Sequence, residues 1–231
     1  SVKDLGFNFG NPQISITPDN KLLFSIPVTI ANTGYYNIGF FNITTKISDA
    51  EGITITTGST VVPVIKKAAS ITIIHNLTMD LNDLPQNSQN YLFNDTELGV
   101  NEVVGMRIAE LIPVQASTNF SMPWGAPLYN FMLGTIQYTA YNLTHSRATI
   151  QISFENHALF DLDADIQMRM YNSTHMPSGE GQTTVHAPRN SAYNGYVDLY
   201  VSTAYITATG SYEIYFATPF LNSGPLVIPY G

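Results

Sequence analysis

The sequence predicts an all-β chain built from two tandem antiparallel β-sandwiches, and three observations lead to this. Its 231 residues include 14 Tyr and 12 Phe, with many Val, Ile and Thr, the residue types enriched in strands. Apolar residues occupy every second position of 22–32, which is the period of a strand with one buried face. The same alternation returns 124 residues later, and it again ends in an asparagine, Asn156.

The second alternating stretch belongs to a longer repeat. When the first half is shifted by 124 residues, the apolar phase is kept over about 55 residues. The matched pairs are Ile26 with Ile150, Val28 with Ile152, Ile30 with Phe154, Asn32 with Asn156, Tyr36 with Phe160, Ile38 with Leu162, Ile73 with Val197 and Leu77 with Val201. Gly58 reaches Gly181 after one deletion. A repeat of this kind indicates two copies of one domain, which we place at residues 1–122 and 123–231.

In the first copy, alternation and turn residues predict strands at 13–16, 22–31, 35–47, 53–57, 61–65, 70–79 and 103–114. The apolar phase flips near Gly39, which indicates a β-bulge there. A short helix is expected over 84–93, with Asp83 as its cap and Pro85 in its first turn. An ordered loop carrying Asn94 is the alternative.

Residues 116–126 are interpreted as the connection between the domains, with Trp124 packed between them or, alternatively, available to stack on a ligand. The second copy is expected to place strands at 132–141, 148–155, 160–171, 183–187, 196–206 and 211–218. About seven short strands per copy, with turns every 8–12 residues, are typical of an antiparallel sandwich.

Composition excludes several classes of function. The net charge is −8 and there are only nine Lys and Arg residues, so no basic patch could neutralise a nucleic-acid backbone. No apolar run reaches the length of a membrane span. Cysteine is absent, so stability must come from packing, and a bacterial or archaeal source fits better than a disulfide-rich animal one.

Two features predict export. The chain begins at Ser1, as after removal of a leader or trimming of a longer chain, and it carries six Asn-X-Ser/Thr sequons. The sequons predict covalent N-glycans at Asn42, Asn76, Asn94, Asn119, Asn142 and Asn172. Composition alone is the alternative explanation of their number. Together with the low charge, these features indicate an extracellular, cell-surface glycoprotein.

Each copy resembles the water-stress and hypersensitive-response (WHy) domain of late-embryogenesis-abundant proteins. The resemblance lies in the strand ending at Asn32, followed by Tyr36, Ile38, a turn at 49–52 and Gly58. In the second copy the strand ends at Asn156, followed by Phe160, Leu162, Gly179 and Gly181. The family's usual proline after the asparagine is replaced by Thr33 and His157.

This resemblance implies an immunoglobulin-like sandwich of about 100 residues, with no enzyme chemistry and a protective or structural role. The fold class expected is therefore two tandem immunoglobulin-like antiparallel β-sandwiches. Tandem sandwiches with many sequons are also similar to exported archaeal surface proteins, including subunits of extracellular threads and pili.

No residues form a catalytic or metal-binding signature, so we expect no enzyme activity, no cofactor and no metal. His75 lies on an apolar strand face and is interpreted as structural, and His157 as a solvated turn residue. Asp161, Asp163 and Asp165 share one strand face and could offer oxygen ligands to Ca²⁺. Because alternate strand residues lie about 7 Å apart, a solvated acidic strand that discourages edge pairing is the preferred interpretation.

The N-terminal segment offers a route to assembly. Leu5, Phe7 and Phe9 share one face of an extended stretch that also contains Val2, and such a stretch suits insertion as a strand into a neighbouring copy. Pairing within its own first domain is the alternative. The function expected is a structural subunit of an extracellular filament or cell-surface assembly, with copies of itself as partners. A carbohydrate-binding or adhesive module using Trp124 and the Tyr-rich strands is the other candidate.

Overall fold

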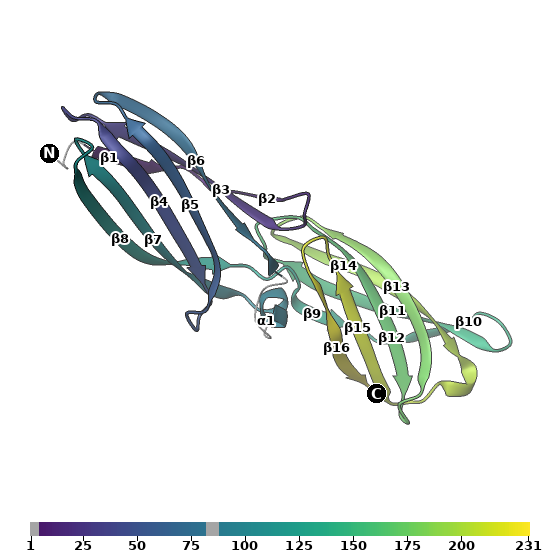
Figure 1. Cartoon of the computed structure of the whole chain (residues 1–231). Coiled ribbons are helices and arrows are strands. Elements are labelled where there is room, and N and C mark those ends of the chain that lie inside the picture. The colour runs from purple at the N-terminus through teal and green to yellow at the C-terminus, as the bar shows by residue number, and fades with distance from the viewer. Residues whose placement is uncertain (1–4, 82–87) are drawn as a thin grey trace. The chain divides into compact units, whose positions relative to one another are not determined.

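The computed structural model describes residues 5–81 and 88–231 of the chain (Figure 1). It confirms the all-β fold of antiparallel sandwiches. The chain divides into two compact units. The first unit comprises Ser1–Asp83 and Glu97–Pro123, and the second comprises Leu84–Thr96 and Trp124–Gly231.

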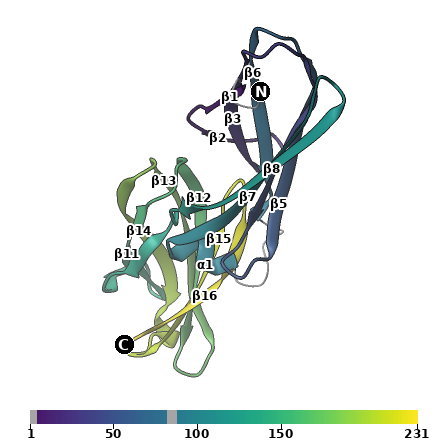
Figure 2. The same cartoon turned by 90° about the vertical axis from the view of Figure 1, so that its left-hand side faces the viewer.

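The first unit contains two four-stranded sheets. Its strands are β1 (Leu5–Phe9), β2 (Gln13–Ile16), β3 (Leu22–Asn32), β4 (Ile38–Ser48), β5 (Thr54–Ile65), β6 (Ala69–Met79), β7 (Thr96–Ile108) and β8 (Ile112–Trp124). In one sheet β3 pairs with β6 on one side and with both β1 and β2 on the other. The other sheet has the order β5-β4-β7-β8, and Figure 2 shows β7 and β8 as a long hairpin.

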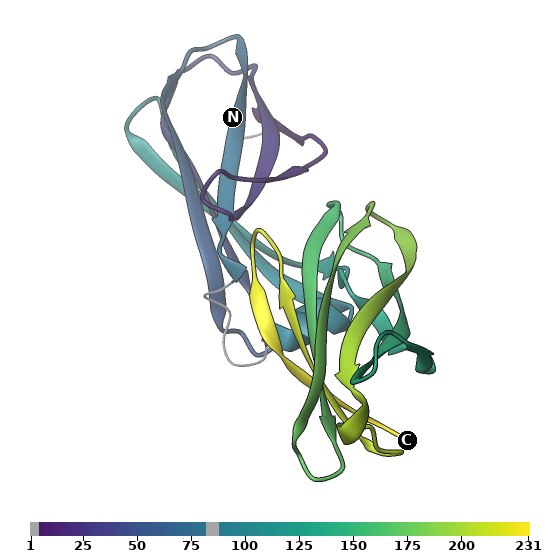
Figure 3. The same cartoon turned by 90° about the vertical axis from the view of Figure 1, so that its right-hand side faces the viewer.

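The second unit contains one eight-stranded sheet of order β10-β11-β14-β13-β12-β15-β16, with β9 also paired to β11. Its elements are α1 (Ser88–Phe93), β9 (Tyr129–Leu133), β10 (Gln137–Ala140), β11 (His145–Asn156), β12 (Leu162–Asn172), β13 (Pro177–Ala187), β14 (Ser191–Ser202), the 3₁₀ turn η3 (Thr203–Tyr205), β15 (Gly210–Ala217) and β16 (Asn222–Tyr230). Figure 3 shows the β15–β16 hairpin in yellow.

The two units repeat one pairing order. In the first, β1 and β2 pair with β3, which pairs with β6; in the second, β9 and β10 pair with β11, which pairs with β14. The remaining strands follow the orders β5-β4-β7-β8 and β13-β12-β15-β16. The layers join along β13 and β14 in the second unit. The shift of 124 residues in the sequence therefore corresponds to a repeated topology.

Alternation builds both cores. Val28, Ile30, Phe41, Ile43 and Ile65 are buried together in the first unit. In the second unit every other residue of β12 is buried from Leu162 to Asn172. Burying one such aliphatic or aromatic side chain contributes about 1.5–3 kcal/mol relative to exposure.

The asparagine that ends each alternating strand is buried, and its side-chain amide joins three backbone carbonyl groups, an arrangement we call the asparagine clamp. The Asn32 side-chain amide donates to the carbonyl oxygens of Tyr36, Ile65 and Lys66, at 2.9, 3.4 and 3.1 Å. That of Asn156 donates to the carbonyl oxygens of Phe160, Ala187 and Pro188, at 3.1, 2.9 and 3.2 Å. One side chain thus ties the ends of β3 and β5, or of β11 and β13, to the following turn, which explains why both strands end in Asn.

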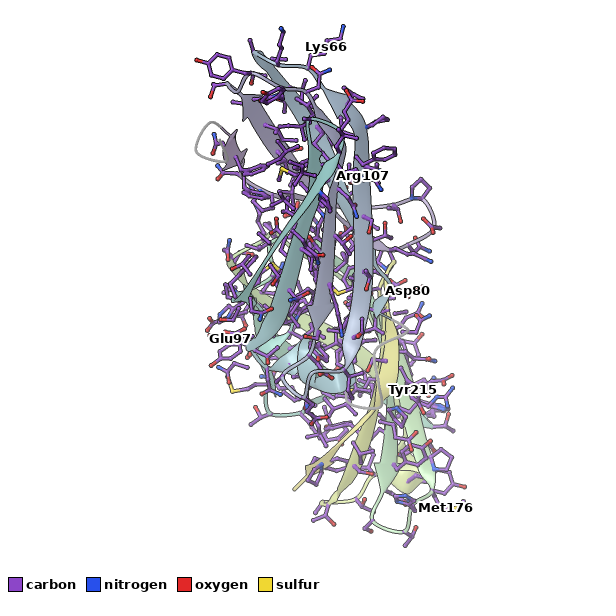
Figure 4. The ribbon with its side chains drawn as sticks, turned by 60° about the vertical axis from the view of Figure 1, so that its left-hand side comes forward. Lys66, Asp80, Glu97, Arg107, Met176 and Tyr215 are labelled. Carbon is purple, nitrogen blue, oxygen red and sulfur yellow. The ribbon has the colours of Figure 1, made fainter. Side chains whose placement is uncertain are left out.

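The predicted bulge is present. Gly39 pairs with Arg107 of β7 and Asn42 with Gly105, so Phe40 and Phe41 of β4 stand opposite a single residue of β7. Phe40 has a positive φ of 49°, and the guanidinium of Arg107 (labelled in Figure 4) lies 4.9 Å from its ring centroid. The bulge shifts the phase of β4, so that Phe41 and Ile43 point into the core.

Three expectations for residues 84–126 are wrong. The predicted strand 103–114 is interrupted by a tight turn, where Ala109 and Glu110 have φ of 52° and 62°. The expected connection 116–126 is largely the edge strand β8, whose polar, uncharged side chains resemble a loop in sequence. The helix α1 forms, but Leu84–Thr96 belongs to the second unit rather than to the first.

Candidate assembly sites

The N-terminal segment lies on its own first unit. Strand β1 pairs antiparallel with β3, with Phe7 opposite Ile30 and Phe9 opposite Val28. The Phe7 ring stacks on Phe41 with centroids 5.7 Å apart. Phe7 and Phe9 nevertheless keep 39% and 46% of their surface exposed. Leu5 opposes Asn32 through its backbone, and Val2 lies outside the described residues.

The second unit has an open groove of about 980 Å³ beside the last strand of its sheet, which we call the seam groove. The groove lies between two strand edges. One wall comes from β9, β10 and their connection, and the other from β15, β16 and residues 206–208. The apolar and aromatic side chains that line it include Phe131, Leu133, Ile136, Tyr138, Tyr212, Ile228 and Tyr230.

Tyr212 is one of the residues that line the seam groove. Its side chain is 2% exposed, and its hydroxyl has no hydrogen-bond partner among the described residues. Its ring centroid lies 4.9 Å from that of Tyr230, whose own hydroxyl donates to the Tyr171 carbonyl oxygen at 3.0 Å. Burial raises the pKa of the Tyr212 phenol well above its usual value. The hydroxyl therefore stays protonated and lacks a partner, which is costly in a buried site.

The first unit has a smaller opening of about 470 Å³ in the equivalent place, between β1–β2 and β8. Phe9 of β1 already lines it, together with Phe120 of β8 and Glu102 of β7. Burial raises the pKa of the Glu102 carboxyl.

His75 also borders this opening and is a structural residue, as its apolar surroundings predicted. Its ring nitrogens lie 2.8 Å from Thr60 Oγ1 and 3.0 Å from Thr45 Oγ1. Burial lowers the pKa of the His75 imidazole, because the charged form loses its hydration.

Four of the six sequon asparagines are exposed: Asn76, Asn94, Asn119 and Asn142. Asn42 is half-buried. The expectation of exposure is wrong for Asn172, which is 7% exposed. Its Oδ1 accepts hydrogen bonds from the backbone N–H of Thr174 and Met176, at 3.0 and 2.9 Å. It organises the β12–β13 turn, where Figure 4 labels Met176.

Asp161, just before β12, and Asp163 and Asp165 within it each have a separate partner. Asp161 Oδ1 accepts from the Arg189 backbone N–H at 2.9 Å, Asp163 Oδ1 lies 2.7 Å from His186 Nδ1, and Asp165 Oδ1 accepts from the Thr184 hydroxyl at 2.7 Å. The Asp163 carboxylate raises the pKa of His186. Within the described part of the chain, no group of three or more acidic, His or Cys side chains converges on a possible metal position.

His157 is held in the second unit by two carboxylates. Its Nδ1 lies 2.8 Å from Asp95 Oδ2 and its Nε2 lies 2.9 Å from Glu155 Oε2. Its ring stacks on Tyr129 with centroids 4.3 Å apart. Hydrogen bonds to Glu155 and to Asp95 raise the pKa of His157. The solvated turn residue expected from sequence is instead a link between 84–96 and the rest of this unit, which the separation of 62 residues from Asp95 hid.

Trp124 is buried within the second unit. Its Nε1 donates to the Tyr91 carbonyl oxygen at 2.9 Å, and its ring contacts Tyr91 and Phe160. Both interpretations of this residue are therefore wrong: it is a core residue of one unit and is not available as a ligand platform.

An aromatic face lies on the outer side of β14. Tyr141 and Tyr200 meet edge to face with centroids 4.8 Å apart, and Tyr196 on the same face is exposed. Between the two tyrosines of β14, Asp198 accepts from the Thr149 hydroxyl at 2.6 Å. Exposed aromatic rings beside fixed polar groups are able to bind sugars.

Comparisons with known proteins give fold similarity only. No protein-family model matches the chain, and no curated protein matches it. Among solved structures, the Streptococcus agalactiae AgI/II polypeptide BspA C-terminal domain is 9% identical with a TM-score of 0.41, over 91% of this chain and 93% of that one.

Two enzymes are also similar in part. A glycosyl hydrolase family 2 member from Bacteroides cellulosilyticus is 8% identical with a TM-score of 0.38, over 90% of this chain. Red sea bream transglutaminase is 10% identical with a TM-score of 0.31, over 98% of this chain. The chain spans only 28% and 31% of the length of these two enzymes.

Among the described helices, none is long and apolar enough to cross a membrane.

Proposed function

We propose that this chain is a non-enzymatic structural subunit of an extracellular filament or cell-surface assembly. Copies are joined when the N-terminal segment of one inserts as a strand into the next. The observation that carries the proposal is the weak attachment of β1, which pairs with only five residues of β3 and leaves Phe7 and Phe9 half-exposed.

The edges of the sheets support the proposal. Strand β8 is 13 residues long and carries no charged side chain. Long edge strands without charge or other protection are sites of pairing between chains. Extracellular location and N-glycosylation of the exposed sequons belong to the same proposal, because glycans would keep so weakly charged a surface soluble.

The test uses a reducible disulfide that fixes β1 to β3 of its own unit. In the variant Asn8→Cys/Thr29→Cys the two residues are direct partners across β1 and β3, at a spacing that a disulfide can bridge. The chain has no other cysteine. We expect the oxidised protein to stay monomeric and the reduced protein to polymerise like the wild type, as followed by sedimentation and electron microscopy. Polymers of equal length in both states would overturn the proposal.

A carbohydrate-binding or adhesive module is the second candidate, and the tyrosine face of β14 favours it. The double variant Tyr196→Ala/Tyr200→Ala should lose binding on a glycan array if this candidate holds. Tyr35→Ala, at an exposed tyrosine of the first unit, is the matched control. Equal binding by both variants, or none by the wild type, would count against it.

A further inference from the structure

We infer that the seam groove of the second unit is the acceptor site for strand β1 of a second copy. This rests on the proposed function and adds to it the place where the inserted strand goes.

The seam groove has the form of a sandwich that lacks one strand. Strand β16 is at one end of the sheet order, and β10, with β9 beside it on β11, is at the other. The inward residues Leu226, Ile228 and Tyr230 of β16 are only half-buried, whereas the inward residues of the central strand β12 are fully buried. The apolar side chains at both edges therefore have room for another layer of contacts.

The lining of the seam groove indicates what kind of occupant suits it. Its side chains are uncharged and mostly apolar, and it lies between strands at the two ends of the sheet order. The edge of an end strand can pair with a further strand through its backbone N–H and C=O groups. The groove thus suits an extended peptide that is apolar on one face and offers backbone polar groups at its sides.

Strand β1 meets this requirement. It has five residues, Leu5–Phe9, and β16 lines the groove with Ile228, Pro229 and Tyr230. Its apolar residues alternate with Gly6 and Asn8, as insertion of one face requires. None of the side chains that line the groove is charged, and β1 has no charged side chain either.

The opening in the first unit fits β1 of a second copy less well. It is about half as large, at 470 Å³ against 980 Å³, and it contains the carboxyl of Glu102. Phe9 of the same chain already lines it. Insertion into the second unit instead joins the beginning of one copy to the last strands of another. Such a contact is heterologous and does not close on itself, so it propagates as a filament.

The experiment mixes two variants that each lack one half of the contact. A copy without residues 1–10 can accept but not donate, and Ile228→Glu can donate but not accept, because a carboxylate in the groove opposes insertion. Each alone should remain monomeric, and an equimolar mixture should give a heterodimer and nothing longer. Val227→Glu is the matched control: it adds the same charge on the exposed face of β16 and should polymerise like the wild type.

Two outcomes distinguish a wrong acceptor site from a wrong proposed function. If Ile228→Glu polymerises as the wild type does, while the deletion and the oxidised Asn8→Cys/Thr29→Cys variant stay monomeric, the acceptor assignment is overturned and the proposed function stands. If the wild type is monomeric even at high concentration, the proposed function fails and the assignment with it. Circular dichroism of each variant shows that the subunit is folded.

A second measurement does not depend on a groove variant. A photoreactive benzoylphenylalanine at Phe7, in polymers formed from isotopically labelled and unlabelled copies, reports the contacts of β1 between copies. Crosslinks between copies should fall on the segments that line the groove, 131–138, 206–212 or 228–231, and crosslinks to other peptides would overturn the assignment.

Discussion

Asn156 satisfies three carbonyl groups with one side-chain amide, and Asn32 does the same in the first unit. Asn156→Asp replaces that donor by a carboxylate facing the same carbonyl oxygens. Since unpaired buried polar groups cost about 1–3 kcal/mol each, we expect the free energy of unfolding of the second unit to fall by about 3 kcal/mol or more. Urea denaturation measures this, with Asn222→Asp at an exposed position as the control. A loss equal to that of the control would contradict the asparagine clamp.

His75 and His157 should respond to pH with opposite signs. The pKa of His75 is lowered from 6.5 in the folded state, so the unfolded chain binds its proton first and stability falls as the pH drops below about 6.5. His75→Gln should therefore lose less stability than the wild type between pH 7.5 and pH 5. Denaturation curves at the two pH values measure the difference. Parallel losses would exclude His75 as the cause.

The pKa of His157 is raised above 6.5 by its carboxylate partners. Its contribution to stability is therefore complete below pH 6.5 and is lost as the pH rises through the folded-state pKa. We expect His157→Gln to destabilise the second unit more at pH 5.5 than at pH 8.5. A destabilisation that is equal at both pH values would indicate that packing on Tyr129, rather than the charge, holds this residue.

Among the elements, β13 and β14 lie close together where Gly181 faces the Asp198 backbone oxygen. A Cβ at Gly181 would collide with that oxygen, so Gly181→Ala should cost about 2–3 kcal/mol, in the range of overpacked cores. Gly58→Ala should cost less, since its Cβ would lie 2.8 Å from the Asn76 oxygen. Gly105, with nothing within 4 Å of its added Cβ, is the control. Thermal unfolding compares the three, and equal melting temperatures would contradict this ordering.

The sequence predicted strands well where one face is buried and poorly where neither face is. Strands β3 and β11 were found because their alternation matches their burial. Strand β8 was missed because nearly all of its residues are exposed, so no periodicity marks it. The packing of α1 in the second unit was missed because its contacts are distant in sequence. For example, Phe93 lies 5.5 Å from Phe216, ring centroid to centroid.

Of the proposed assembly contact, the inserting strand β1 could be predicted from the sequence but the seam groove could not. The alternation of Leu5, Phe7 and Phe9 with Gly6 and Asn8 predicts from the sequence alone that β1 is a strand with one apolar face. The seam groove is not visible in the sequence, since it depends on which strands end the sheet of the second unit.

For the whole molecule, exposure sets which sequons can carry glycans. We expect native protein to exceed its bare mass of 25.4 kDa, with glycans among Asn76, Asn94, Asn119 and Asn142 and none on the buried Asn172. Intact-mass analysis and glycopeptide mapping test this. A mass equal to that of the bare chain would contradict N-glycosylation, and a glycan on Asn172 would contradict its place in the β12–β13 turn.

The division of the chain has a consequence for how the protein could come apart. Because Leu84–Thr96 belongs to the second unit while 97–123 returns to the first, the polypeptide passes between the units three times, after Asp83, Thr96 and Pro123. A protease that cuts once after Pro123 would leave α1 on the other fragment, still packed against Phe131 and Phe216 through Phe93. A nicked molecule should therefore elute as one species in gel filtration until it is denatured. During synthesis on the ribosome, β7 and β8 of the first unit emerge only after α1 of the second unit. Neither unit can therefore be completed before synthesis of the other has begun.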